Sequence, residues 1–308
     1  MKLFGVKAID VLSVANGLYS FAKTSEEAHE RVLITGGPGS GKTRLLELIV
    51  TARELLATGE RTMDGISFIR PGNRTSKVVL SWQLTVEEQT TIDASSPIVS
   101  TEIIFRADDE EDVDARMRYL MERYGHDDAT PKFEYFSERR RLDVGGGGAA
   151  LDEFDQKSLR TNPSPRKFSW LPAFMVELPE EPAKAARFAD VLERFSPSCA
   201  YDAQRHALTS RGRMLRSLKE LSASEADAVC FAATTALIGL SGSIVLVDRP
   251  ELHGIDPVRA LAGLSALGTD NQLILASPSP VFAAGFEGVI IQLDAQTGAD
   301  ATTNRGPG

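Results

Sequence analysis

A glycine-rich segment near the start of the chain constrains the fold of this 308-residue protein more than any other feature. The segment reads Gly36-Gly37-Pro38-Gly39-Ser40-Gly41-Lys42-Thr43 and fits the GxxxxGK[ST] pattern. An apolar run at residues 32–34 precedes it, and apolar residues at helical spacing follow it over residues 45–55. The sequence therefore predicts a strand, a tight loop and a helix in direct succession.

The residue types in this loop suit the binding of a phosphate chain. Glycines lack a Cβ atom, so the backbone can wrap closely around phosphates with successive N–H groups pointing inward. The first turn of the following helix adds the positive end of its dipole. Lys42 can reach the β- and γ-phosphates, and the Thr43 hydroxyl can hold Mg²⁺. We therefore expect residues 36–43, with the adjacent Arg44, to bind a nucleoside triphosphate and Mg²⁺.

A second apolar run, residues 244–247, ends in an acidic residue, Asp248. In a phosphate-loop protein such a carboxylate emerges at the carboxyl end of its strand and binds Mg²⁺ through water, opposite the loop threonine. We therefore expect Asp248 to lie opposite Thr43 in the fold. The chain continues with Arg249-Pro250-Glu251-Leu252-His253, in which Glu251 is a further candidate catalytic acid.

Upstream of this strand, residues 221–225 (LSASE) have two interpretations that are compatible with each other. Ser222 followed three residues later by Glu225 is a capping box, which predicts the start of a helix. The first turn of such a helix also offers a serine hydroxyl and free N–H groups. Ser222 is therefore a candidate contact to the γ-phosphate of a nucleotide held by a second subunit.

The remaining elements predict an α/β fold in which helices alternate with the strands of a predominantly parallel sheet. Further strand-like runs lie at residues 78–84, 98–105, 133–136, 273–276 and 289–293, and an exposed acidic helix at 108–124. We divide the chain into an N-terminal part of a nucleotide-binding head (1–142), a flexible Gly/Pro-rich segment (143–182), a helical lobe (183–221), a C-terminal part of the head (222–294) and a frayed tail (295–308).

Composition and charge exclude several classes of protein. No stretch approaches 18 uncharged apolar residues, so we expect no membrane span. Cys199 and Cys230 lack metal spacing and the four histidines are scattered, which argues against a zinc site or a disulfide framework and favours the reducing cytoplasm. The net charge of −9 argues against nucleic-acid binding over the whole surface, though not in a local basic groove.

The order of these motifs resembles the ABC-type ATPases of the RecF and SMC kind, and most closely the small bacterial AAA-domain ATPases related to the overcoming-lysogenisation-defect family. The resemblance covers residues 30–45 and 218–292. It implies a P-loop NTPase fold: an ABC-ATPase-like head with a mostly parallel central sheet, antiparallel N-terminal strands and an inserted helical lobe. It implies ATP and Mg²⁺ as cofactors, and a homodimer or heteromer that encloses the nucleotide. Lys42 and Thr43 would hold phosphate and Mg²⁺, Asp248 would hold Mg²⁺, and Ser222 would contact the partner's nucleotide.

Three further residues have positions that resemble family elements. Gln83 falls where the family has a glutamine loop, although a solvent-facing strand residue is an equally good interpretation. Residues 133–139 resemble the family's YFPE-R element, in which Arg139 is either a phosphate contact or a surface arginine. Asp256 lies near the loop that crosses the dimer interface, one position from the commonest spacing.

Two residues depart from the family pattern. The position after the magnesium aspartate, where the family has a water-activating glutamate, is Arg249, whose guanidinium cannot accept a proton. The switch histidine is replaced by Pro278, which has neither a side-chain donor nor a titratable group. Glu251 can substitute as the base only if the loop presents it differently. Because a general base contributes about 10²–10⁴-fold in rate, we expect tight ATP binding with slow or absent hydrolysis.

Two functional hypotheses remain. The first is a nucleotide-gated dimerising switch with weak ATPase activity at most. The second is a nucleic-acid-associated sensor or antiviral defence subunit that works with a separate effector protein. Basic side chains in residues 205–219 and 157–167 are candidates for a nucleic-acid path, although a helix supporting the nucleotide lobe explains the first stretch equally well. The LS-x-S-E and D-x-P-E-L-H motifs disfavour a kinase, and no coupling segment for a transporter is recognisable.

Overall fold

The central sheet of the protein is parallel, as predicted. The computed structural model describes residues 1–57, 62–106, 114–126, 131–142 and 160–293. The strands of the central sheet lie in the order β12 (Val289–Leu293), β3 (Arg31–Gly36), β11 (Gln272–Ser277), β10 (Ile244–Asp248) and β6 (Phe133–Phe136). Every neighbouring pair in this sheet is parallel. Strands β10 and β11 are buried along their whole length, as expected for a parallel sheet covered on both faces.

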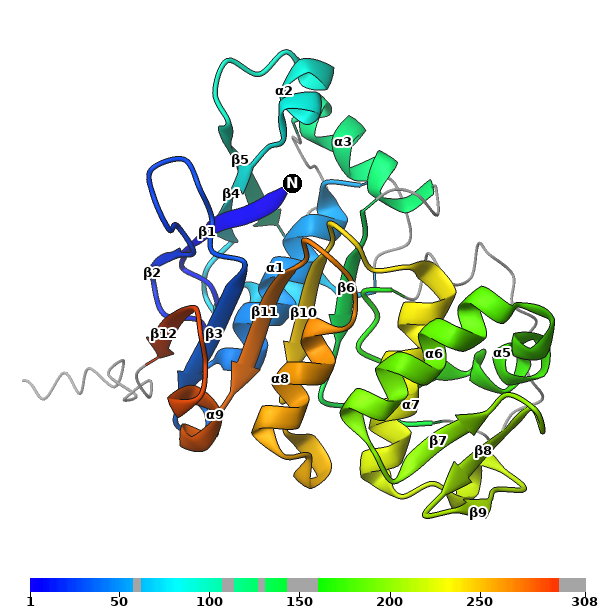
Figure 1. The fold of residues 1–308 in the computed structure, drawn as a ribbon. Helices are drawn as coiled ribbons and strands as arrows, with labels where there is room; N and C mark the ends of the chain where they lie inside the picture. Colours follow the sequence, from blue (N-terminus) through cyan, green and yellow to red (C-terminus); the bar gives the residue numbers. More distant parts are fainter. Residues whose placement is uncertain (58–61, 107–113, 127–130, 143–159, 294–308) are drawn as a thin grey trace, which may run out of the picture.

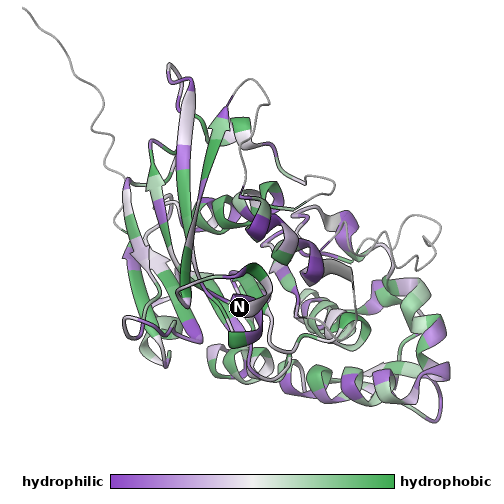
Figure 2. Cartoon of the chain, turned by 90° about the horizontal axis from the view of Figure 1, so that it is seen from above, coloured by the Kyte–Doolittle hydropathy of each residue, from purple (hydrophilic) through white to green (hydrophobic). Residues whose placement is uncertain are grey.

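A second, antiparallel sheet contains the predicted N-terminal strands. Its order is β2 (Gly17–Ser20), β1 (Lys2–Ile9), β4 (Thr75–Gln83) and β5 (Ile98–Arg106). Buried and more exposed residues alternate along β4, the pattern of a sheet with one face in the core. Figure 2 shows the corresponding mixture of hydrophobic and hydrophilic residues along the strands. Helix α1 (Lys42–Leu55) lies between this sheet and the parallel sheet and contributes half of its residues to their shared core.

The other face of the parallel sheet is covered by helices from the second half of the chain (Figure 1). Helix α7 (Ala223–Ile238) is buried along most of its length and packs against α6 (Pro182–Phe195) and α5 (Leu171–Glu177). Helices α8 (Pro257–Ser265) and α9 (Pro280–Ala284) extend this layer. Shorter elements are α2 (Val86–Ile92), α3 (Ala115–His126) and the 3₁₀ segments η1 (Gly65–Phe68), η2 (Pro165–Phe168), η3 (Leu178–Glu180), η4 (Leu218–Glu220) and η5 (Leu252–Gly254).

The element predictions are confirmed where a periodic pattern was long or a motif was specific. The strand before the glycine-rich loop is β3, the helix after it is α1, and the run at 133–136 is β6. Ser222 and Glu225 form both hydrogen bonds of a capping box at the start of α7. The predicted acidic helix at 108–124 corresponds to α3, and residues 107–113 lie outside the described residues, as do residues 295–308.

The prediction of a flexible segment over residues 143–182 is wrong from residue 160 onward; residues 143–159 lie outside the described residues. Side chains of this segment belong to the core around α6 and α7, namely Phe168, Trp170, Leu171, Phe174 and Leu178. Four of the five prolines that suggested a loop lie in the first turns of η2, α5, η3 and α6. Proline is favourable there because the first-turn N–H has no helical partner and the proline φ angle suits a helix.

The prediction of an entirely helical lobe over residues 183–221 is also wrong in part. Helix α6 is followed by a three-stranded antiparallel sheet of β7 (Cys199–Asp202), β8 (Ala207–Ser210) and β9 (Arg213–Met214). Between β8 and β9, Arg211 and Gly212 both have positive φ angles, 49° and 77°. Two such residues form the tight turn that joins antiparallel strands, so the arginines here belong to a hairpin rather than a helix.

Candidate nucleotide site

The glycine-rich loop joins β3 to α1 at the carboxyl edge of the parallel sheet, with the side chain of Lys42 folded over it. The Lys42 ammonium donates hydrogen bonds to the carbonyl oxygens of Gly36 (2.8 Å) and Gly37 (2.7 Å) and to Ser40 Oγ (3.2 Å). Burial and the positive charge of Arg249 lower the pKa of Lys42, while Asp248 and Glu251 act to raise it. The cation therefore lies inside the loop and close to two carboxylates.

The loop glycines have two different roles. Gly41 caps α1 with a φ angle of 91°, and a Cβ atom there would lie 2.5 Å from the carbonyl oxygen of Ser13. A Cβ atom on Gly36 would lie 2.3 Å from the carbonyl oxygen of Leu293. Gly37 and Gly39, in contrast, have no neighbouring atom within 4 Å of a built Cβ position. Gly36 and Gly41 are thus required by the fold, whereas Gly37 and Gly39 leave open space where phosphate oxygens can approach the backbone.

Asp248 ends β10 at the same edge and is close to the start of α1, as predicted. Its side chain is hydrogen-bonded to Thr43, and the residue is only 1% exposed. Burial raises the pKa of Asp248 to about 6, and the carboxylates of Glu138 and Glu47 add to the increase. Asp248 Oδ2 is buried without a hydrogen-bond partner.

This pair of oxygen donors suits Mg²⁺. A buried carboxylate oxygen without a partner is costly unless a cation or water contacts it, and Mg²⁺ prefers carboxylate and hydroxyl oxygens together with water and phosphate. Thr43 and Asp248 would therefore hold the ion, which would neutralise phosphate charge. Among the described residues there is no cluster of three or more His, Cys, Asp or Glu side chains that could hold a metal by itself.

The turn after Asp248 directs the next two charged side chains differently. Arg249 has a left-handed φ angle of 52°, and its guanidinium lies 3.7 Å from a carboxylate oxygen of Glu138. Glu251, two residues on, has both carboxylate oxygens buried without a hydrogen-bond partner. Glu251 also contributes to the electrostatic environment of Lys42. Besides Asp248, Glu251 is thus the acid whose charge acts to raise the pKa of Lys42.

A buried arginine that the sequence analysis missed fixes this turn. Arg140 donates hydrogen bonds to the carbonyl oxygens of Asp248 (2.6 Å), Arg249 (2.6 Å) and Ser137 (3.1 Å). The preceding residue, Arg139, which the sequence suggested as a phosphate contact or a surface arginine, is exposed. No sequence signal distinguishes these adjacent arginines, because only the path of the chain after β6 decides which one points inward.

Ser222 caps the start of α7. The first turns of this helix lie near the Asp248 turn, because Asp227 is paired with Arg140, which donates to the Asp248 carbonyl oxygen. Ser222 is exposed. Its hydroxyl donates to Glu225 Oε2 at 2.7 Å and accepts a bond from the Glu225 N–H at 3.4 Å. Within the part of the chain that the structure describes, Ser222 is thus accessible to another molecule.

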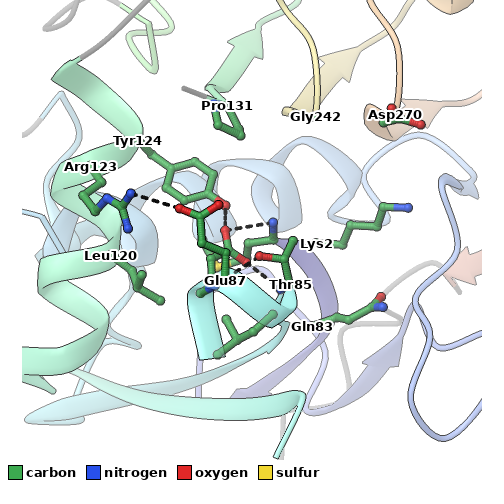
Figure 3. Close-up of a pocket in the computed structure, with 13 residues that line it drawn as sticks. Lys2, Gln83, Thr85, Glu87, Leu120, Arg123, Tyr124, Pro131, Gly242 and Asp270 are labelled. Atoms are coloured by element: carbon green, nitrogen blue, oxygen red, sulfur yellow. Dashed lines mark hydrogen bonds and ion pairs between the residues drawn. The ribbon is translucent and has the colours of Figure 1, made fainter. Parts of the chain in front are cut away.

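Gln83 does not belong to this site, which corrects its assignment as a nucleotide-binding residue. It pairs with Lys2 at the start of β1 and accepts a hydrogen bond from the Ala28 N–H. Figure 3 shows it in a cavity of about 520 Å³ together with Gly242 and Asp270. The last two residues precede β10 and β11, so this cavity lies at the amino edge of the sheet, opposite Lys42. The distance of Gln83 from the loop along the sequence did not predict its place in the fold, because β4 runs antiparallel to β1 and ends away from the loop.

The other candidate residues have structural contacts. Arg44 donates to the carbonyl oxygen of Ser67 (2.6 Å) and stacks over the Phe68 ring, so its guanidinium supports α1. Asp256 caps α8 by accepting bonds from the Val258 and Arg259 N–H groups. In the segment suggested for nucleic acid, Lys167 is buried and paired with Glu134, and Arg160 is buried as well. Residues 157–159 lie outside the described residues, so the described part of this stretch offers no continuous basic surface.

Comparison with solved structures shows which fold this is. The SMC head bound to the C-terminal winged-helix domain of ScpA matches with a TM-score of 0.56 and 13% identity, over 92% of each chain. The recombination mediator protein RecF with ATP, from the RecFOR pathway, matches with a TM-score of 0.51 and 12% identity, over 96% of this chain and 97% of RecF. The protein thus has the α/β fold of SMC-head and RecF ATPase domains. No family model and no curated protein matches its sequence.

Proposed function

We propose that this protein binds Mg²⁺–ATP as an ABC-type ATPase head and acts as a nucleotide-gated dimerising switch. The observation that carries the proposal is that Asp248 Oδ2 and both Glu251 carboxylate oxygens are buried without a hydrogen-bond partner, while both charges act on Lys42. Unpartnered buried charges are unfavourable in the free protein, so a ligand carrying a cation and phosphates would stabilise the site. Lys42, Thr43 and the open backbone at Gly37 and Gly39 supply the matching phosphate contacts.

Dimerisation is proposed from the position of Ser222. It is exposed at the start of a helix of 16 residues, whose first turns are joined through Asp227 and Arg140 to the Asp248 turn at the carboxyl edge of the sheet. A two-fold arrangement brings the Ser222 helix of each subunit to the nucleotide of the other, and such an interface is self-complementary. Because the nucleotide would then contribute contacts to both subunits, ATP would stabilise the dimer by linkage.

Hydrolysis in this proposal is slow or absent, and Glu251 is its only candidate base. Arg249 has replaced the usual carboxylate and points toward Glu138. Glu251 is two residues further on, with both oxygens free to accept a proton from water. In this scheme Asp248 and Thr43 would hold Mg²⁺ and Lys42 would neutralise phosphate charge. Glu251 would accept the proton of the water whose oxygen bonds to the γ-phosphorus, while the bond to the β,γ-bridging oxygen breaks and ADP leaves.

Sedimentation with and without Mg²⁺–ATP tests the switch. We expect a monomer-to-dimer shift that Lys42→Ala and Ser222→Arg both abolish, Lys42→Ala by removing nucleotide binding and Ser222→Arg while preserving it. Binding of a fluorescent ATP analogue separates the two variants. Equal masses with and without ATP in the wild-type protein, although the analogue binds, would contradict the switch but not the nucleotide site.

Single-turnover phosphate release tests the role of Glu251. A decrease of about 10²-fold or more in Glu251→Gln, with analogue binding unchanged, is expected for loss of a general base. Glu87→Gln is the matched control because Glu87 pairs with Arg123 at the opposite edge of the sheet. Equal rates in wild type and Glu251→Gln would exclude Glu251 as the base.

A second candidate function is that of a sensor or antiviral defence subunit with an effector protein or nucleic acid as partner. It rests on Arg211, Arg216 and Lys219, which are exposed around the small sheet β7–β9. The SMC head was solved with ScpA and RecF acts in the RecFOR pathway, so a protein partner is the expected class for this chain too. Salt-dependent binding of DNA or RNA that weakens in Arg211→Ala and Arg216→Ala would support nucleic acid.

A cytoplasmic location is part of the proposal. Cys199 and Cys230 are both free and buried, which suits a reducing compartment. Among the helices that the structure describes, none has the length and apolar character needed to cross a membrane.

A further inference from the structure

Arg140 is buried at the junction between the Asp248 turn and helix α7. Its side chain is fully enclosed, and so is that of Asp227 on α7, with which it forms an ion pair at 3.2 Å. The guanidinium also lies over the Phe231 ring, one helical turn further along α7, at 5.2 Å from the ring centre. One side of Arg140 therefore contacts α7 through a charge and an aromatic face.

The other side of the same guanidinium contacts the turn that carries the candidate magnesium ligand and base. Two of its N–H groups donate to the carbonyl oxygens of Asp248 and Arg249, each at 2.6 Å. These carbonyls flank the residue with the left-handed φ angle, Arg249. Holding both of them fixes the direction in which the chain leaves β10, and hence the position of Glu251.

We propose that Arg140 is a positioning residue that holds the Asp248–Glu251 turn and helix α7 in register, so that Mg²⁺–nucleotide binding at the turn is coupled to Ser222. Arginine suits this role because its planar fork presents several donors in fixed directions, whereas a lysine ammonium is a single point charge. Asp227 and Phe231 complete the contact from α7. This inference rests on the proposed function, since it assigns Ser222 to the nucleotide of a partner.

The two halves of the contact can be separated by substitution. Asp227→Asn removes the ion pair to α7 but leaves the carbonyl bonds to the turn. Arg140→Met removes both. Arg140→Met alone leaves the Asp227 charge buried without a partner, which is destabilising. The double variant Arg140→Met/Asp227→Leu therefore removes both charges. Thermal unfolding shows which variants remain folded.

Two readouts distinguish positioning from general support of the fold. The first is the Mg²⁺ concentration for half-maximal binding of a fluorescent ATP analogue, and the second is the dissociation constant of the ATP-dependent dimer. We expect Arg140→Met to raise both by about tenfold, and Asp227→Asn to raise only the dimer constant by about that factor, within the range of typical coupling between sites. Analogue binding without Mg²⁺ should be unchanged, because Lys42 bonds to the loop carbonyls of Gly36 and Gly37, whereas Arg140 bonds to carbonyls outside the loop.

Lys167→Met is the matched control, since it removes another buried ion pair, to Glu134, in the same half of the molecule. It should lower the Tm and leave both readouts unchanged.

The proposal is overturned if folded Arg140→Met, or the double variant, behaves as the wild type in both readouts, or if Lys167→Met reproduces their changes. If wild-type protein binds the analogue without dimerising, the proposed switch fails. The test of Arg140 is then the Mg²⁺ concentration for half-maximal analogue binding, and an unchanged concentration in Arg140→Met overturns its role.

Discussion

The two edges of the parallel sheet both carry buried acidic side chains, but they differ in whether those side chains have partners. At the amino edge, Glu88 accepts hydrogen bonds from the Thr85 N–H (2.7 Å), the Met1 amino group (3.0 Å) and the Tyr124 hydroxyl (Figure 3). At the carboxyl edge, Asp248 Oδ2 and both Glu251 oxygens have no partner. The first arrangement is internally complete, whereas the second has unused binding capacity.

This difference indicates where a ligand is needed. The cavity of about 520 Å³ lies at the amino edge, so cavity volume by itself would place a ligand at that edge. Burying a charge without a partner is expensive, so a protein keeps such groups where a ligand, ion or water completes them. Whether buried polar groups have hydrogen-bond partners is therefore a better guide to a ligand site in this fold than cavity volume. Substitutions at the carboxyl edge should affect nucleotide binding more than substitutions at the amino edge.

The largest expected effect is at Lys42. Lys42→Ala removes a partly buried cation that holds the loop carbonyls, and it should weaken ATP-analogue binding about 1,000-fold, or roughly 4 kcal/mol. Titration calorimetry measures this. Glu88→Gln at the other edge is the control and should leave the affinity unchanged. Equal losses in both variants would show that the two edges are not functionally distinct.

Asp248 should show a large pH-dependent effect on stability. Its pKa is about 6 in the folded protein against an ordinary value of 3.8. The folded state therefore binds more protons between these values, and raising the pH through this window destabilises it by up to about 3 kcal/mol, a cost fully present above pH 6. Asp248→Asn should accordingly unfold at higher urea concentration than wild type at pH 8, and at similar concentration near pH 4. Mg²⁺–ATP should stabilise only the wild type at pH 8.

The glycine-rich loop offers a matched pair of smaller effects on stability. Gly41→Ala forces a Cβ atom against the Ser13 carbonyl at a φ angle of 91°, which should cost about 2 kcal/mol of unfolding free energy. Gly37→Ala meets no atom, so Tm should be unchanged while nucleotide affinity falls. Thermal unfolding and analogue binding measure both. A stable Gly37→Ala variant with undiminished affinity would mean that phosphates do not approach at Gly37.

The smallest effect is expected at the amino edge. Glu87 and Arg123 form an ion pair at 3.4 Å with side chains 80% and 43% exposed, and exposed pairs contribute little. Glu87→Gln should change the unfolding free energy by less than about 0.5 kcal/mol and leave nucleotide binding unchanged. A loss of affinity in this variant would indicate that the cavity at this edge communicates with the nucleotide.

Much of the fold and part of the candidate site could be predicted from short patterns. Residues 32–55 specify a strand, a loop and a helix through apolar spacing and glycine content, and Asp248 follows a buried strand. Ser222 and Glu225 define the start of α7 because a capping box satisfies two N–H groups locally. These features depend on neighbouring residues only.

Other features could not be predicted in the same way. The hairpin at Arg211-Gly212 has the turn geometry of paired strands, but the basic residues around it equally suggested an exposed helix. The aromatic side chains of residues 168–178 pack on α6 and α7, although the prolines between them are typical of loops too. In both places the local pattern suits two structures, and packing against distant elements selected one.

The sequence by itself determined the phosphate loop, the acid at the end of β10 and the cap of α7, because backbone geometry and periodicity are properties of adjacent residues. Only the tertiary structure decided that Gln83 lies at the far edge, that Arg140 rather than Arg139 is buried, and that Arg249 pairs with Glu138 while both Glu251 oxygens are buried without a partner. These outcomes depend on strand direction and on contacts between β6, α7 and β10. Such contacts join residues more than 80 positions apart along the chain, and no local pattern records them.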